Sequence, residues 1–156
     1  MIKFRPHHFL CALTFEGRGY SDEFIKNFSD LVRTLRAKNG NEVQIEVVDH
    51  TDSVCSPCPH RLGLFCEQQQ KIQDLDEKHA QQIGFQPGET LTWGEAKQRI
   101  AHQLTIKDFH KICDGCSWKE LGICEKTVTK FLDASNKENK FSSFKKIIGR
   151  GWAGGK

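Results

Sequence analysis

Two separate segments of the chain carry the same pattern of three cysteines. Residues 54–67 read VCSPCPHRLGLFCE, and residues 112–125 read ICDGCSWKELGICE. Each is an apolar residue followed by Cys-x2-Cys-x7-Cys-Glu, with a glycine shortly before the third cysteine. One Cys-x2-Cys pair is common, but two matched triads are hard to obtain by chance. The fold must therefore contain two loops with converging thiols, and the candidate ligands are Cys55, Cys58, Cys66, Cys113, Cys116 and Cys124.

The spacing within each triad suits metal coordination by thiolates. Two cysteines three positions apart in a tight turn can direct both sulfurs to one atom, and the backbone amides of the turn stabilise the thiolate charge. Pro57 and Gly115 fit such turns, and the later glycine lets the chain bend before the third sulfur arrives. Structural zinc sites and the common iron–sulfur clusters have four protein ligands, so each triad lacks one.

The missing ligands are expected near the N-terminus. If residues 4–15 are helical, His7 and His8 share a face with Cys11, which follows them in the next turn. We expect Cys11 to complete one triad and a histidine, His7 or His8, to complete the other, with His60 as a further candidate. The other histidines are interpreted as ordinary surface or partly buried residues: His50, His79, His102 and His110.

Metal ligands are a better explanation of the cysteines than disulfides. Seven cysteines cannot all pair within one chain. The sequence contains no apolar run of about 18 residues, which is the length needed to span a membrane. The segment before Phe15 lacks a signal-peptide pattern, because His7 and His8 interrupt its apolar stretch and no small-residue cleavage site follows. We therefore expect a cytoplasmic protein, in a compartment where structural disulfides are rare.

The remaining pattern predicts an α+β fold that is mostly helical, with a small sheet and the cysteine loops stapled by metal. Helices are expected from Ser21 to Gly40, over 67–83, 92–104, 105–112 and 125–134, while residues 4–15 form a short helix or a strand. Residues 43–48 alternate as a strand whose expected partner lies near Phe4, and 85–91 are a loop. The hydrophobic content of 37% is low for a globular domain, so metal cross-links are expected to add stability.

The positive charge of the chain is concentrated at its end. The net charge is +3, and residues 137–156 contain six basic residues against one acidic residue. We expect a cysteine-rich domain over residues 1–135 and a basic, Gly-rich, loosely ordered tail over 136–156. Lysines interleaved with Phe141, Phe144 and Trp152 could contact nucleic acid.

The chain also resembles a known family. The residues that carry the resemblance are RPHHFLC at 5–11, GYSDEF at 19–24, DHTDSVCSPCP at 49–59 and CDGCSW at 113–118. This combination is similar to the prokaryotic domain-of-unknown-function family 1284, although Pro6 stands where members usually have glycine. Thiolates suit zinc and iron–sulfur clusters equally. The resemblance favours an iron–sulfur cluster, with [4Fe–4S] preferred and zinc as the alternative, and it implies no reaction.

Three functions stay open at this stage. The first is an iron–sulfur protein that transfers electrons to a redox partner protein or senses redox state. The second is a zinc-stabilised module that binds nucleic acid or a protein through the basic tail. The third is a metalloenzyme with a site near His7, His8 and Cys11, in which Cys11 is a ligand or an activated nucleophile. The sequence has neither a Gly-x-Gly-x-x-Gly motif nor a P-loop, so a nucleotide-dependent enzyme is not expected.

Overall fold

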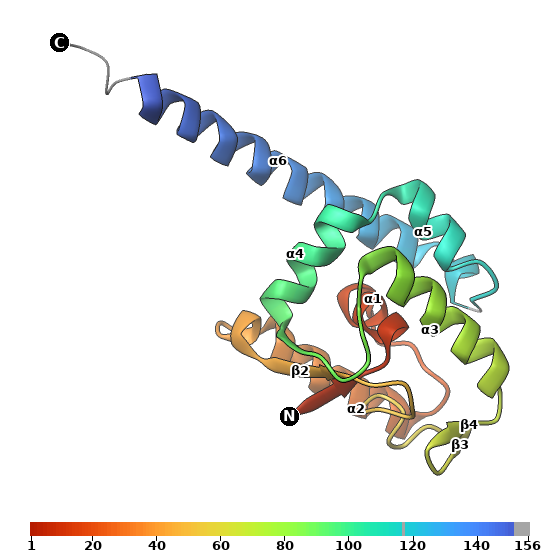
Figure 1. Cartoon of the computed structure of the whole chain (residues 1–156). Helices are drawn as coiled ribbons and strands as arrows, with labels where there is room; N and C mark the ends of the chain where they lie inside the picture. Colours follow the sequence, from red (N-terminus) through yellow and green to blue (C-terminus); the bar gives the residue numbers. More distant parts are fainter. Residues whose placement is uncertain (117, 152–156) are drawn as a thin grey trace.

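The structure is a computed structural model that describes the backbone of residues 1–116 and 118–151 and the side chains of 1–116 and 118–140. It has the expected α+β fold, which is mostly helical with two small sheets (Figure 1). The helices are α1 Pro6–Thr14, α2 Asp22–Arg36, α3 Gln69–Ile83, α4 Trp93–Gln103, α5 Ile106–Ile112 and α6 Ile123–Gly151. The strands are β1 Ile2–Phe4, β2 Gln44–Val47, β3 Arg61–Leu62, β4 Phe65–Cys66 and β5 Thr90–Thr92, with 3-10 turns η1 Gly40–Glu42 and η2 Lys119–Leu121.

The larger sheet has three strands in the order β1-β2-β5. β1 pairs with β2 in parallel, with Phe4 opposite Val47, so the partner expected near Phe4 is confirmed. β5 pairs with β2 in the antiparallel direction, with Leu91 opposite Ile45. The prediction of a loop over 85–91 is wrong at its end, because β5 is a three-residue strand with one apolar side chain, too short for its alternation to be read.

Residues 4–15 combine the two structures that the sequence left open. The strand β1 ends at Phe4, and the helix α1 begins at Pro6, a residue suited to the first helical position. α1 is the central helix, since Phe9 is fully buried and stacks on Phe85 with 4.2 Å between ring centroids. This packing holds the N-terminal half of α1 inside the protein.

Helix ends follow their local signals in most places. Ser21 accepts a hydrogen bond from the Phe24 amide, and Thr92 and Thr105 each open a helix with a complete capping box. α2 ends at Arg36 and not at Gly40 as predicted. Gly40 serves a different purpose, because a Cβ there would lie 2.0 Å from the carbonyl oxygen of Leu35.

The last helix is much longer than the sequence predicts. An end near Ala134 is expected, yet α6 continues to Gly151 and projects away from the body (Figure 1). No proline or glycine occurs between Ala134 and Gly149, so nothing in that stretch breaks the helix. The division into a domain of 1–135 and a tail stays a prediction, and the side chains of Phe141, Phe144 and Trp152 lie outside the described residues. Within the described part of the chain, no helix combines the length and the apolar character needed to cross a bilayer.

Candidate metal centre

One cavity in the body of the protein brings together Cys11 of α1 and the cysteines of both triads. Its volume is about 170 Å³. The N-terminal half of the chain supplies α1, the first loop and β4, while the end of α5 and the start of α6 supply the second triad. All seven cysteines are free thiols. The cysteines and histidines that line the cavity are Cys11, Cys55, Cys58, Cys66, Cys113, Cys116, Cys124, His7, His8, His60 and His79.

Both Cys-x2-Cys pairs form the predicted tight turns. The Cys58 amide donates to the Cys55 carbonyl at 2.9 Å, and the Cys116 amide donates to the Cys113 carbonyl at 3.1 Å. Each turn brings two thiols to the cavity wall. The spacing of the repeat therefore produces the predicted turn in both segments and places both thiols of each pair at the cavity.

The segment leading to the third cysteine differs between the two repeats. Before Cys66 the chain forms the β3–β4 hairpin, and before Cys124 it forms the 3-10 turn η2. Gly63 and Gly122 have φ values of +61° and +73°, so both use the left-handed conformation that glycine adopts without strain. The sharp bend expected from the sequence is confirmed in both repeats.

Cys11 is grouped with the second triad. The charges of Cys113, Cys116 and Cys124 all raise the pKa of the Cys11 thiol, after the larger effect of burial. One turn later in α1, the Thr14 hydroxyl donates to the Cys124 sulfur at 3.7 Å. The wall of α1 that carries Cys11 therefore faces the second triad, and these four thiols form one group.

Burial makes these thiols poor nucleophiles when no cation is bound. It raises the pKa of Cys11 well above the usual value and raises that of Cys113 to about 12. The pKa values of Cys55, Cys58 and Cys124 are also raised, mainly by burial. A catalytic cysteine needs the opposite shift. The environment thus disfavours the hypothesis that Cys11 is an activated nucleophile, and it suits thiols that ionise when a cation binds.

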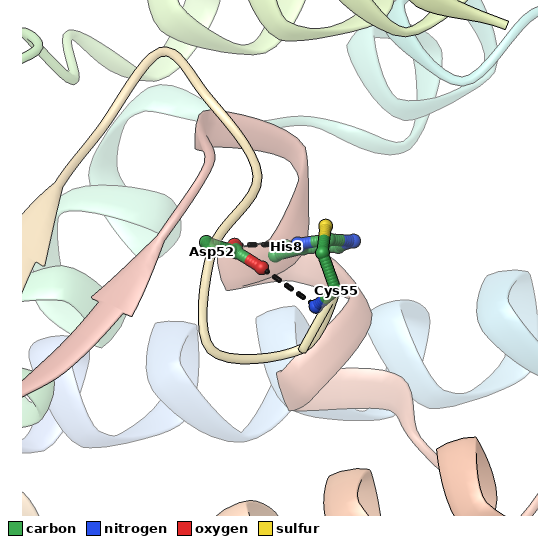
Figure 2. Close-up of side chains that lie close together, drawn as sticks. All are labelled: His8, Asp52 and Cys55. Atoms are coloured by element: carbon green, nitrogen blue, oxygen red, sulfur yellow. Dashed lines mark hydrogen bonds and ion pairs between the residues drawn. The ribbon is translucent and has the colours of Figure 1, made fainter. Parts of the chain in front are cut away.

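His8 belongs to a compact group with Asp52 and Cys55. Their potential ligand atoms lie within 4.8 Å of one another, and this is the one such group of three among the described residues. The Nδ1 atom of His8 donates to Oδ2 of Asp52 at 2.6 Å, while Oδ1 of Asp52 accepts from the Cys55 amide at 3.1 Å (Figure 2). Asp52 has a lowered pKa: burial opposes its ionisation, but His8 and the backbone amides outweigh that effect.

His7 is held by a second buried carboxylate. Its Nδ1 atom lies 2.5 Å from Oδ1 of Asp76, whose other oxygen accepts from Nε of Arg5 at 2.7 Å. The pKa of His7 is lowered by burial and by the neighbouring His8. The Nη1 and Nη2 atoms of Arg5 are buried and have no hydrogen-bond partner, although Arg5 lines the cavity. A buried guanidinium in this state calls for an additional acceptor.

His79 was expected to be an ordinary surface or partly buried residue, and that prediction is wrong. It is 2% exposed, its Nδ1 donates to the Leu75 carbonyl, and its Nε2 lies 3.6 Å from the Cys113 sulfur. Burial lowers the pKa of His79 to about 3, so the ring is neutral. The ring centroid of His7 lies 6.2 Å from that of His79 and 4.1 Å from that of His8. Three imidazoles thus form a row between the two cysteine triads.

His60 lies at the exposed side of the cavity. Its Nδ1 atom is 2.9 Å from Oε2 of Glu67, and its ring packs edge-on against Tyr20. The Tyr20 hydroxyl in turn accepts from the indole of Trp118 at 3.3 Å. Tyr20 thereby connects the loops of the two triads.

A comparison with family models identifies the chain. The model described as "Protein of unknown function (DUF1284)" matches residues 19–122. The chain belongs to this family. No curated protein and no solved structure matches it. The DUF1284 match includes the two Cys-x2-Cys turns, while Cys11 and Cys124 lie on either side of it.

The sequence analysis did not predict four residues that belong to the site in this DUF1284 protein. Asp52 had a weak signal, since it stands in the aspartate-rich stretch before the first triad. Arg5, Asp76 and His79 had none as site residues, because nothing in a single sequence brings Arg5, just before α1, to Asp76 of α3, or His79 of α3 to Cys113. Each acts through a contact between distant segments.

Proposed function

We propose that this DUF1284 protein is an iron–sulfur protein of the reducing cytoplasm that transfers electrons to a partner protein or senses redox state. Its principal cluster, expected to be [4Fe–4S], would be held by Cys11, Cys113, Cys116 and Cys124. The observation that carries the proposal is the convergence of all seven thiols on one cavity, with these four grouped around one part of it. Such a donor set fits a cluster, which supplies one-electron chemistry when bound.

The separation of the sulfurs favours a cluster over zinc in this group. Zinc bound to thiolates at about 2.3 Å in a tetrahedron needs sulfurs about 3.8 Å apart. Among the described residues, no three cysteine sulfurs lie within 4.8 Å of one another. A cluster holds its thiolates farther apart, because each one binds a different iron. The spacing of the sulfurs and the volume of the cavity both support an iron–sulfur cluster, which is larger than a single zinc ion.

The burial of the thiols supports the same conclusion. Cys11, Cys113 and Cys124, whose pKa values are raised mainly by burial, gain little as free thiols, whereas a cation stabilises their charges together. The remaining thiols, Cys55, Cys58 and Cys66, line the same cavity and would supply a second ligand set. Zinc bound to these sets, with binding through the basic end of the chain, is the competing proposal, and a metalloenzyme at α1 is the third.

Serine substitutions test the assignment of the principal cluster. Cys11→Ser and Cys116→Ser are expected to lose most of the iron and acid-labile sulfide that the anaerobically purified wild type contains. Cys58→Ser serves as the matched control, because it lies in a Cys-x2-Cys turn of the same cavity but in the other group. Full retention of iron in Cys11→Ser, combined with loss in Cys58→Ser, would contradict the assignment.

A further inference from the structure

We propose that the cavity contains a second metal site of different chemistry, in which Nε2 of His8 and Sγ of Cys55 bind a single divalent cation of the zinc class, with Asp52 as the positioning residue. This site shares none of the four ligands of the proposed cluster, so it does not depend on that proposal. The mixed nitrogen and sulfur donors are those that zinc binds in proteins.

The first argument is the proximity of the donors. His8, Asp52 and Cys55 come from α1 and from the loop before the first Cys-x2-Cys turn, two segments that the fold brings together. A ring nitrogen of His8, a carboxylate oxygen of Asp52 and the sulfur of Cys55 lie within 4.8 Å of one another (Figure 2). Two donors at about 2.0–2.3 Å from one zinc lie at most about 4.6 Å apart, so a group of this size needs only a small movement to close around a cation.

The second argument is that Asp52 is already fully engaged. Its oxygens accept hydrogen bonds from the amides of Arg5, Val54 and Cys55 and from Nδ1 of His8. A carboxylate has about four acceptor positions. Asp52 is therefore a partner of the ligands and not a ligand itself.

The third argument follows from the tautomer of His8. Because a carboxylate only accepts, the proton lies on Nδ1, and the lone pair of the neutral ring is on Nε2. Metal-binding histidines almost always have this arrangement, with the far ring nitrogen donating to a carboxylate or carbonyl. The same aspartate also fixes the Cys55 amide, so a single residue sets the position of both donors.

The fourth argument is the buried charge of Arg5. Its Nη1 and Nη2 atoms are buried and have no hydrogen-bond partner among the described residues. A metal-bound thiolate at this place would give the guanidinium a negative partner. Cys58 and Cys66 line the same cavity, but neither forms a compact group with His8 and Cys55 among the described residues, so a bound cation would have to draw them closer to fill its remaining positions.

The other histidines of the cavity fit this site less well. His7 is held by Asp76, His79 lies beside Cys113 in the other group, and His60 is bonded to Glu67. None of them belongs to a compact group with the first triad among the described residues. The choice of His8 is therefore specific and can be tested against its neighbours.

The test uses the full-length chain with Cys116→Ser and Cys124→Ser, which disable the proposed cluster group. Zn²⁺ alone is added to the reduced protein, and X-ray absorption at the zinc edge reports its ligands. The expected result is one zinc per chain with at least one imidazole nitrogen and one or more sulfurs. Coordination by sulfur alone, or the absence of stoichiometric zinc, overturns the proposal.

Variants then identify the residues, with Co²⁺ absorption as the readout of thiolate and imidazole coordination. In the same background, His8→Ala and Asp52→Asn are each expected to weaken Co²⁺ binding by about 10–100-fold. His60→Ala is the matched control and is expected to leave the spectrum and affinity of the site unchanged. An unchanged affinity in His8→Ala, or an equal loss in His60→Ala, refutes the assignment. Where a variant fails to fold, X-ray absorption at the zinc edge of the chain with His8 intact still tests whether an imidazole binds the metal.

Discussion

Replacing Asp76 by asparagine should reveal how much stability the buried ion cluster of α1 and α3 contributes. Asp76 accepts from Nε of Arg5 at 2.7 Å and from His7 at 2.5 Å, and its side chain is 10% exposed. Burial opposes its ionisation, but His7 and Arg5 outweigh burial and lower its pKa to about 2. The neutral amide of Asp76→Asn would leave the guanidinium of Arg5 buried without a counter-charge.

The magnitude follows from the pKa. A carboxylate with a pKa of about 2 when folded and about 3.9 when unfolded contributes about 2.5 kcal/mol at pH 7. Because the folded pKa is the lower one, this contribution is complete above the unfolded pKa and is lost as the pH falls through about 2. Breaking a buried pair by removing one partner costs about 3–5 kcal/mol in total, so Asp76→Asn should lose that much at pH 7.

Urea unfolding at pH 7 and pH 3 measures the effect on the reduced chain in the presence of chelator. The difference in free energy of unfolding between wild type and Asp76→Asn should shrink by about 1 kcal/mol or more at pH 3. Asp74→Asn is the matched control, because Asp74 lies two residues away on α3, where it accepts a hydrogen bond from the Gln70 side chain at the surface. It should change stability by less than about 0.5 kcal/mol. The reasoning would be refuted if the difference in free energy of unfolding between wild type and Asp76→Asn stayed constant with pH, or if Asp74→Asn lost as much stability as Asp76→Asn.

Four further predictions concern the core, the helix ends and the thiols. Phe9→Ala should lower the free energy of unfolding by about 3–5 kcal/mol, because Phe9 is fully buried against Phe85; a loss under 1 kcal/mol in a denaturant titration would count against the packing described. Thr92→Ala should cost about 1 kcal/mol in the same assay through loss of its capping box, and no loss would mean that α4 does not need the cap. Gly122→Ala should cost about 1–2 kcal/mol, because φ is +73° there; a neutral effect would contradict that backbone conformation. In metal-free protein at pH 8, Cys113 should react with iodoacetamide far more slowly than in urea, because its folded pKa is about 12, and equal rates would show that it is not buried.

The features that a single sequence predicts are those encoded by neighbouring residues. The capping boxes at Thr92 and Thr105, the strand over 43–48 and both Cys-x2-Cys turns depend on residues within a few positions of one another, and the structure confirms them. The glycine bends before Cys66 and Cys124 are of the same kind. Local chemistry also pointed to α1, and residues of α1 line the cavity.

The features that escaped prediction depend on distant contacts or on weak local signals. β5 forms because β2 offers it an edge, so its three residues carry no pattern of their own. His79 looked like a surface histidine of α3, yet it faces Cys113 because α3 packs against α5. The grouping of Cys11 with the second triad and of His8 with the first likewise follows from where α1 lies between them. The metal itself stays a prediction.

The most direct test of the central claim is a metal analysis of the wild-type protein purified without oxygen. The ultraviolet–visible spectrum, iron, zinc and acid-labile sulfide are measured on one sample. The account predicts a brown protein with iron and sulfide in near-equal amounts, close to four of each per chain for one [4Fe–4S] cluster, and about one zinc per chain for the second site. A colourless protein that holds zinc but no sulfide, also after reconstitution with iron and sulfide, would contradict it.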